Sequence, residues 1–195
     1  MINTKRRLPF ALAVAAIFLL GGCGVTEKVT DVFNPPPIPP CPENRILAAA
    51  SELTVYREGD GRDLTDVDFE GRIDNMGLAC LTKVDKKTGI GKMQVEVVFN
   101  FVASRGPANT TRKARYPYFI SITDLNKNIL MHEKYDIEVA FQGNQSKFTF
   151  RNQPNIIELD VSPDRAGKDY LIYGGFVLTR EQLQLFQQRR KQTRG

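Results

Sequence analysis

The stretch "KMQVEVVFNFVA", Lys92 to Ala103, decides the fold. Apolar residues stand at every second position in it, namely Met93, Val95, Val97, Phe99 and Phe101. A period of two places alternate side chains on opposite faces of a β-strand, so these five share one face. The stretch therefore predicts a long strand with one face in a hydrophobic core.

The same period recurs on both sides of this stretch. "VDFEGRID" (67–74) places Val67, Phe69 and Ile73 on one face, and "NILMHEKYDIEVA" (128–140) does so for Met131, Tyr135, Ile137 and Val139. Further strands are expected at 116–124, 147–150, 156–161 and 169–178, with turn signals at 86–89, 125–128, 142–145 and 162–167. Residues 43–56 fit either a short helix or an edge strand.

Seven or eight short strands joined by turns predict an all-β fold, an antiparallel β-sandwich of immunoglobulin or fibronectin-III type. The C-terminal "TREQLQLFQQRRKQ" differs from the strands. Thr179 followed three residues later by Gln182 is a capping box. We therefore expect a short helix and basic tail over 179–195, with Leu183 and Phe186 facing the sandwich.

The first 23 residues carry a different signal. Lys5, Arg6 and Arg7 precede an apolar run at 8–20, which is shorter than the roughly 20 residues that span a bilayer. Leu20-Gly21-Gly22-Cys23 then resembles the lipobox of bacterial lipoproteins. The resemblance implies cleavage before Cys23 and acylation of its thiol. In lipoproteins an aspartate after this cysteine retains the protein on the inner membrane, so the resemblance, with Gly24 at this position, implies the outer membrane.

Four segments follow from these signals: a signal peptide at 1–22, a lipid-anchored proline-rich tether at 23–42, a β-sandwich domain at 43–178, and the helix with its tail at 179–195. Removal of the signal leaves 24 of the 27 bases beside 22 acids, a net charge of +2. A nearly neutral domain argues against nucleic-acid binding. In an exported chain, Cys41 and Cys80 predict a disulfide, the alternative being two buried thiols.

The loop and strand over 104–118 are the main candidate site. They contain four bases and two tyrosines with no acid among them: Arg105, Arg112, Lys113, Arg115, Tyr116 and Tyr118. Such a set suits a protein interface or the phosphates of a lipid headgroup or lipopolysaccharide. A basic solubilising hairpin is the alternative interpretation.

Catalytic and metal sites are not indicated. His132 is the only histidine and lies in the polar phase of its strand, and the acids over 60–74 lack a calcium-loop pattern. We therefore expect no cofactor, no metal and no enzymatic activity.

Three stretches of the exported domain, "GRDLTDVDFEGRI", "SRGPA" and "RYPYFISITD", resemble a family of small lipoproteins of the Gram-negative envelope. The resemblance implies no known activity and supplies no catalytic residues. With the lipobox and Gly24, we expect a lipid-anchored protein on the periplasmic face of the outer membrane. Two functions are expected: an interaction or assembly module that binds an envelope protein, or a module that binds glycan, lipid or lipopolysaccharide through 104–118.

Overall fold

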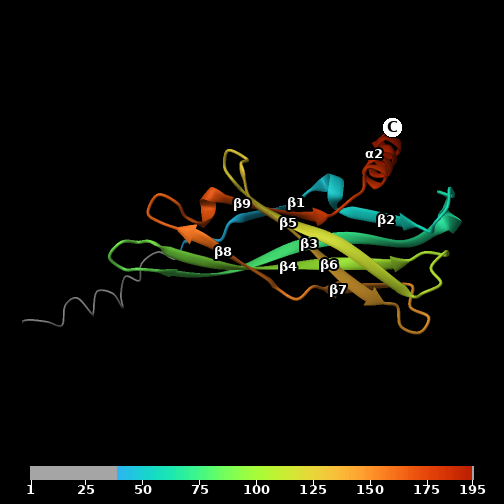
Figure 1. The fold of residues 1–195 in the computed structure, drawn as a ribbon, viewed down its shortest axis with the longest axis horizontal. Coiled ribbons are helices and arrows are strands. Elements are labelled where there is room, and N and C mark those ends of the chain that lie inside the picture. Colours follow the sequence, from blue (N-terminus) through green and yellow to red (C-terminus); the bar gives the residue numbers. More distant parts are fainter. Residues whose placement is uncertain (1–38, 195) are drawn as a thin grey trace, which may run out of the picture. The chain divides into compact units, whose positions relative to one another are not determined.

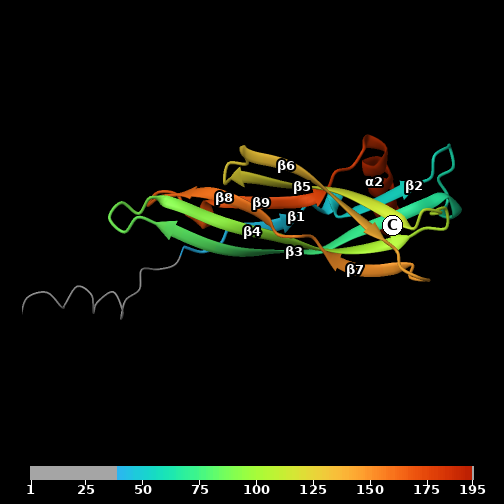
Figure 2. The same cartoon turned by 60° about the horizontal axis from the view of Figure 1, so that its bottom comes forward.

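The computed structural model describes residues 39–194, with side chains as far as residue 190. Two β-sheets and one C-terminal helix make up this part of the chain (Figures 1 and 2). The four-stranded sheet has the order β1–β9–β5–β6, formed by Glu43–Ile46, Tyr170–Phe176, Lys113–Asp124 and Ile129–Ala140. Its β1–β9 pair is parallel, and its other two pairs are antiparallel.

The second sheet has five strands: β2 (Glu52–Tyr56), β3 (Val67–Val84), β4 (Gly91–Arg105), β7 (Lys147–Arg151) and β8 (Asn155–Val161). The order is β2–β3–β4, and β4 pairs with β7 along one half and with β8 along the other. Three 3₁₀ turns, η1 (Ala48–Ala50), η2 (Leu64–Asp66) and η3 (Gly167–Asp169), connect strands. Helix α2 (Arg180–Arg194) follows β9.

The core lies between the two sheets, as the sequence predicts. The five alternating residues of β4 are all at most 1% exposed. Aromatic rings from both sheets pack around Phe101, including those of Tyr118, Phe150 and Phe176. The prediction of an all-β, two-layer, sandwich-like fold is confirmed. Residues 39–194 contain nine strands in place of the expected seven or eight, because the ambiguous segment 43–56 contains β1 and β2 separated by η1.

Strand β3 runs between two ends of the sandwich, which we call the entry end and the helix end. At the entry end, the described chain begins at Pro39, and the turns at 85–90 and 162–166 lie near the last residues of β3. The turn at 124–129 lies beside the start of β9. At the helix end, the loops at 57–66, 106–112 and 141–146 lie near Val67, and α2 packs beside β2 (Figure 1). The 18 residues of β3 separate the two ends by about 55 Å.

Candidate functional site

Helix α2 starts with the capping box that the sequence predicts. The backbone N–H of Gln182 donates to Thr179 Oγ1 at 3.2 Å, and the backbone N–H of Thr179 donates to Gln182 Oε1 at 2.9 Å. These two bonds satisfy donors that a helix start otherwise leaves open. Leu183 and Phe186 are half-buried, in agreement with the expected packing face.

Hydrogen bonds from Arg189 and Gln182, which we call the polar bracket, hold α2 against β2. The guanidinium of Arg189 donates to Thr54 Oγ1 at 3.1 Å, to Tyr56 Oη at 3.3 Å and to Glu70 Oε1 at 3.5 Å. Gln182 Nε2 also donates to the Thr54 carbonyl at 3.5 Å. The bracket therefore joins residues that lie more than 100 positions apart in the sequence, and Thr54 is buried beneath it.

A second bracket comes from the loop between β2 and β3. Arg62 Nε donates to Glu181 Oε1 at 2.6 Å, while its Nη1 donates to the carbonyls of Gly59 and Gly61 at 2.8 and 2.7 Å. The same guanidinium lies 5.4 Å from the centre of the Tyr56 ring. The hydrogen bond to the Glu181 carboxylate raises the pKa of Arg62 above its already high ordinary value.

Between the two brackets lies a half-open groove of about 360 Å³, which we call the α2–β2 groove. Ligand sites commonly have volumes of this order. Its walls combine apolar side chains with amides, and its only charged lining residues are the paired Arg62 and Glu181. The lining residues are Thr54, Val55, Tyr56, Arg62, Thr179, Glu181, Gln182, Gln184, Leu185 and Gln188. Such a surface suits an uncharged, partly apolar segment of a partner.

The turn at 63–66 borders this groove. Asp63 Oδ1 accepts hydrogen bonds from the Thr65 amide at 2.7 Å and the Thr65 hydroxyl at 2.6 Å, and these bonds lower the Asp63 pKa. Asp66 is buried and pairs with Arg57 at 2.5 Å. Leu64, between them, is 80% exposed. The acids of this turn therefore shape the loop, and a large apolar side chain is left on its surface.

The structure does not gather the six residues predicted over 104–118 into one surface. Tyr116 and Tyr118 are buried, and their hydroxyls donate to the Glu70 carbonyl at 3.0 Å and to Asn155 Oδ1 at 2.9 Å. Burial raises the pKa of both phenols. The tyrosines therefore do not lie beside the bases, because β5 alternates and they occupy its inward phase.

Two of the four bases have acidic partners on β6. Arg115 makes two hydrogen bonds to Asp136, at 2.9 and 2.8 Å, and Lys113 pairs with Glu138 at 3.3 Å. The register of β5 on β6 places these charges beside each other. The absence of acids within the segment itself therefore does not make it a free cationic surface.

Arg112 and Arg105 remain at the helix end. Arg112 has φ 59°, and its backbone N–H donates to Asn109 Oδ1 at 2.7 Å. Its Nε donates to the Phe141 carbonyl at 3.3 Å, and its Nη2 is buried without a hydrogen bond. Arg105 ends β4, where its backbone N–H donates to the Ser146 carbonyl at 2.7 Å.

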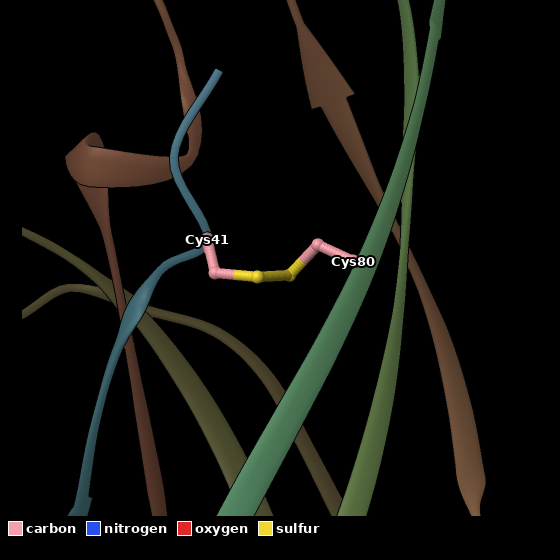
Figure 3. The surroundings of a disulfide bond; sticks show 2 residues. All are labelled: Cys41 and Cys80. Carbon is pink, nitrogen blue, oxygen red and sulfur yellow. A yellow bond between two sulfur atoms is a disulfide. The ribbon is translucent and has the colours of Figure 1, made fainter. Parts of the chain in front are cut away.

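The predicted disulfide between Cys41 and Cys80 is present (Figure 3). Its Cα atoms are 5.8 Å apart, and it links the residues just before β1 to the second half of β3. Cys23 and the signal segment lie outside the described residues. The lipobox therefore stays a prediction from the sequence.

His132 is exposed on β6, and its ring lies 5.2 Å from that of Phe119. Within the described part of the chain, no three His, Cys, Asp or Glu residues are placed to hold a metal ion. No helix in the same residues has the length and apolar character needed to cross a bilayer.

Sequence reasoning did not find the α2–β2 groove. The sequence contains two relevant signals, the capping box and the shared face of Leu183 and Phe186. They predict that α2 packs on the sandwich, but they do not identify the strand that it contacts. Comparison with protein-family models, with curated proteins and with solved structures gave no match to this chain. The geometry and the sequence motifs therefore carry the functional argument.

Proposed function

We propose that this chain is a lipid-anchored protein of the bacterial cell envelope that binds a protein partner at its helix end and catalyses no reaction. The lipobox at Leu20–Cys23 supports the anchor, as does the proline-rich stretch after it. The disulfide is typical of an oxidising compartment outside the cytoplasm. Gly24 favours the periplasmic face of the outer membrane.

The observation that carries the binding role is the α2–β2 groove. Its walls are held by Arg62 and Arg189, and the one pair of charges that lines it is neutralised internally. A groove of this kind recognises a segment by shape and amide hydrogen bonds rather than by charge. An immunoglobulin-like or fibronectin-III-like relationship is part of the proposal, supported by two facing sheets with inward alternation.

Quantitative crosslinking and affinity purification of the lipidated protein from solubilised envelopes test the partner. Gln188→Lys introduces a charge into the groove, whereas Gln187→Lys adds the same charge on an exposed helix position outside its lining. We expect Gln188→Lys to reduce recovery of the partner at least about tenfold, a loss of roughly 1.4 kcal/mol. Equal recovery with both variants would place the partner elsewhere.

Cys23→Ser tests the anchor. We expect the variant to accumulate as an unprocessed, unlipidated precursor, because lipid transfer needs the thiol. Mass spectrometry of the N-terminal peptide measures this directly. Normal processing and membrane retention of the variant would rule out the lipobox.

A second candidate function is binding of an anionic glycan or lipopolysaccharide near Arg105 and Arg112. In its favour, neither Arg105 nor Arg112 forms an ion pair with an acid among the described residues, whereas Lys113 and Arg115 do. Salt-sensitive binding that Arg112→Ala removes and Arg115→Ala retains would support it, because Arg115 is already paired with Asp136. Binding that is unchanged by Arg112→Ala would exclude this site.

A further inference from the structure

One edge of strand β6 has no strand beside it among residues 39–194. β6 is the outermost strand of the four-stranded sheet, and β5 is its only partner in this part of the chain (Figure 2). The register between the two is regular from Met131 to Ala140, so this part of β6 is extended and has no bulge. A long regular edge offers backbone hydrogen-bonding groups to any strand that approaches it.

Two hydrogen bonds identify the residues of β6 whose backbone groups point to this edge. The Val177 N–H donates to the Pro117 carbonyl at 2.9 Å, so Pro117 bonds towards β9 and forms a non-hydrogen-bonded pair with Asp136 of β6. The Phe141 N–H donates to the Arg112 carbonyl at 2.8 Å, which gives the same phase. Because the two kinds of pair alternate, the backbone groups of the even-numbered residues point away from β5. These residues are His132, Lys134, Asp136 and Glu138.

The side chains of the same four residues are all exposed on the outward face of β6, and their charge changes along the strand. Its first half carries the imidazole of His132 and the ammonium of Lys134, and its second half carries two carboxylates. Lys134 forms no ion pair with a residue in 39–194, whereas the two carboxylates pair with bases of β5. A strand that is basic in one half and acidic in the other is complementary to a reversed copy of itself.

Antiparallel pairing with a second copy of β6 about Tyr135 matches these charges. Lys134 then lies opposite Asp136 of the second copy and His132 opposite Glu138, and the twofold axis repeats both pairs. Opposite charges at directly opposed positions stabilise a sheet, and like charges destabilise it. A shift of the axis by one residue, to Lys134 or to Asp136, sets two lysines or two aspartates against each other. The charges therefore select the register about Tyr135 over its neighbours.

Backbone geometry fits the same register. The even-numbered residues form four hydrogen-bonded pairs that exchange two bonds each, about eight in all. Tyr135 faces its own copy in a non-hydrogen-bonded pair, with Cα atoms about 4.5 Å apart. Glu133 shares the inward phase of Tyr135 but is exposed, and it accepts the Tyr135 hydroxyl at 2.5 Å. Its carboxylate therefore already has a hydrogen-bond donor within its own chain.

We propose that two copies of this chain pair through β6, antiparallel about Tyr135, and join their four-stranded sheets into one. The occupant of the edge is thus a second copy, selected by charge and register. β6 does not line the α2–β2 groove, so this pairing is independent of the partner proposed for that groove. The paired assembly presents two identical grooves.

Disulfide formation at introduced cysteines tests the register in the full chain. Cys41 and Cys80 are bonded to each other, and the unchanged chain measures the background. We expect Tyr135→Cys to form covalent dimers under mild oxidation, because Cα atoms about 4.5 Å apart suit a disulfide. Ile137→Cys is the matched control, since its copy lies about 13 Å away along the strand, beyond the reach of a disulfide. A mixture of Ile137→Cys with Glu133→Cys should crosslink again, and it carries the test if Tyr135→Cys does not fold.

Charge reversal tests the selection of the second copy. We expect Lys134→Glu to raise the dissociation constant of the dimer at least about tenfold in sedimentation equilibrium, because the twofold axis repeats the change in both pairs. Lys83→Glu, the same change at an exposed lysine of β3 in the other sheet, should leave the dissociation constant unchanged.

Three outcomes overturn the proposal. The first is a monomer at every concentration, with no disulfide above background. The second is equal crosslinking of Tyr135→Cys and Ile137→Cys, or an equal effect of the two charge reversals, which indicates contact without the proposed register. The third is a disulfide from residue 135 to a different envelope protein, which assigns the edge to strand addition by that protein.

Discussion

The entry end and the helix end share strand β3 but are fixed by different chemistry. At the entry end, a covalent bond joins Cys41 to Cys80, and carboxylates close the tight turns. At the helix end, α2 is held to β2 by side-chain hydrogen bonds from Arg62, Gln182 and Arg189. One end is therefore linked covalently, while the other can open without breaking a sheet hydrogen bond.

The difference teaches that stability is unevenly distributed along this sandwich. Exposed ion pairs such as Arg62–Glu181 contribute little to the free energy of unfolding, because water screens them. Contacts of that strength release a helix by local opening well before the sheets unfold. The groove proposed to bind a partner is thus built from an element that can adjust its position.

The largest expected effect comes from removing the covalent link. The bridge closes a loop with a sequence separation of 39, for which the chain-entropy model gives about 4 kcal/mol. We expect the Cys41→Ser/Cys80→Ser double variant to lose about 2–4 kcal/mol in urea unfolding. Amide hydrogen exchange should accelerate most in β1. In α2, exchange should accelerate only for amides that exchange through global unfolding.

Reduction of the unchanged protein is the control for that variant, since it breaks the same bond without changing a side chain. If both treatments leave the unfolding midpoint unchanged, the disulfide does not contribute to the free energy of unfolding, and the proposed difference between the two ends is wrong.

A smaller effect is expected at the helix end from Thr179→Ala. The change removes the oxygen that caps the Gln182 amide and should cost about 1 kcal/mol. Amide exchange in the first turns of α2 should become about fivefold faster, while β9 and the entry end stay as they are. Gln187→Ala, an exposed change on the same helix, serves as the control. Uniform acceleration across both sheets would show instead that α2 unfolds together with them.

The smallest effect is pH dependence in the turns. Hydrogen bonds from Thr88 lower the pKa of Asp85, and hydrogen bonds from Thr65 lower that of Asp63. Because each folded pKa lies below the unfolded value near 3.9, the ionised carboxylates stabilise their turns above about pH 4. This contribution is lost as the pH falls through the folded pKa, so both ends should loosen in acid.

Carboxyl chemical shifts followed by NMR measure the two pKa values. Asp85→Asn should remove the acid dependence of the Lys87 and Thr88 amides and leave that of Thr65 unchanged. Titration of Asp85 at its unperturbed value would show that the hydrogen bonds of the 85–90 turn do not persist in solution.

The core of the fold was predictable because apolar side chains alternate along β4 from Met93 to Phe101. The second half of β3 was not predictable from the sequence. A bulge at Asp74 changes which alternate side chains face the core, and Gly77, Ala79 and Thr82 are small or polar. The irregularity at 73–75 moves Met76 inward and breaks the period of two. Periodicity therefore found the part of β3 before the bulge and missed the remainder.

The candidate site was less predictable than the core. The inward phase of Ala114, Tyr116 and Tyr118 was readable in the sequence, but the neighbouring arginines attracted a surface interpretation. The pairing of Arg115 with Asp136 depends on strand register. The hydrophobic pattern predicts which face of each strand is buried, but it does not predict which residues of the two strands stand opposite each other. The groove depends on a contact between Thr54 and Arg189, 135 residues apart, which no local pattern encodes.

The disulfide also determines how the domain carries mechanical load. Tension applied to the chain at Pro39 passes at Cys41 into Cys80 and so into β3, bypassing the four-residue strand β1. A partner that pulls on the opposite end loads β3 along its length. The ladder between β3 and β4 then resists in shear, with many hydrogen bonds sharing the force, instead of being peeled apart one bond at a time.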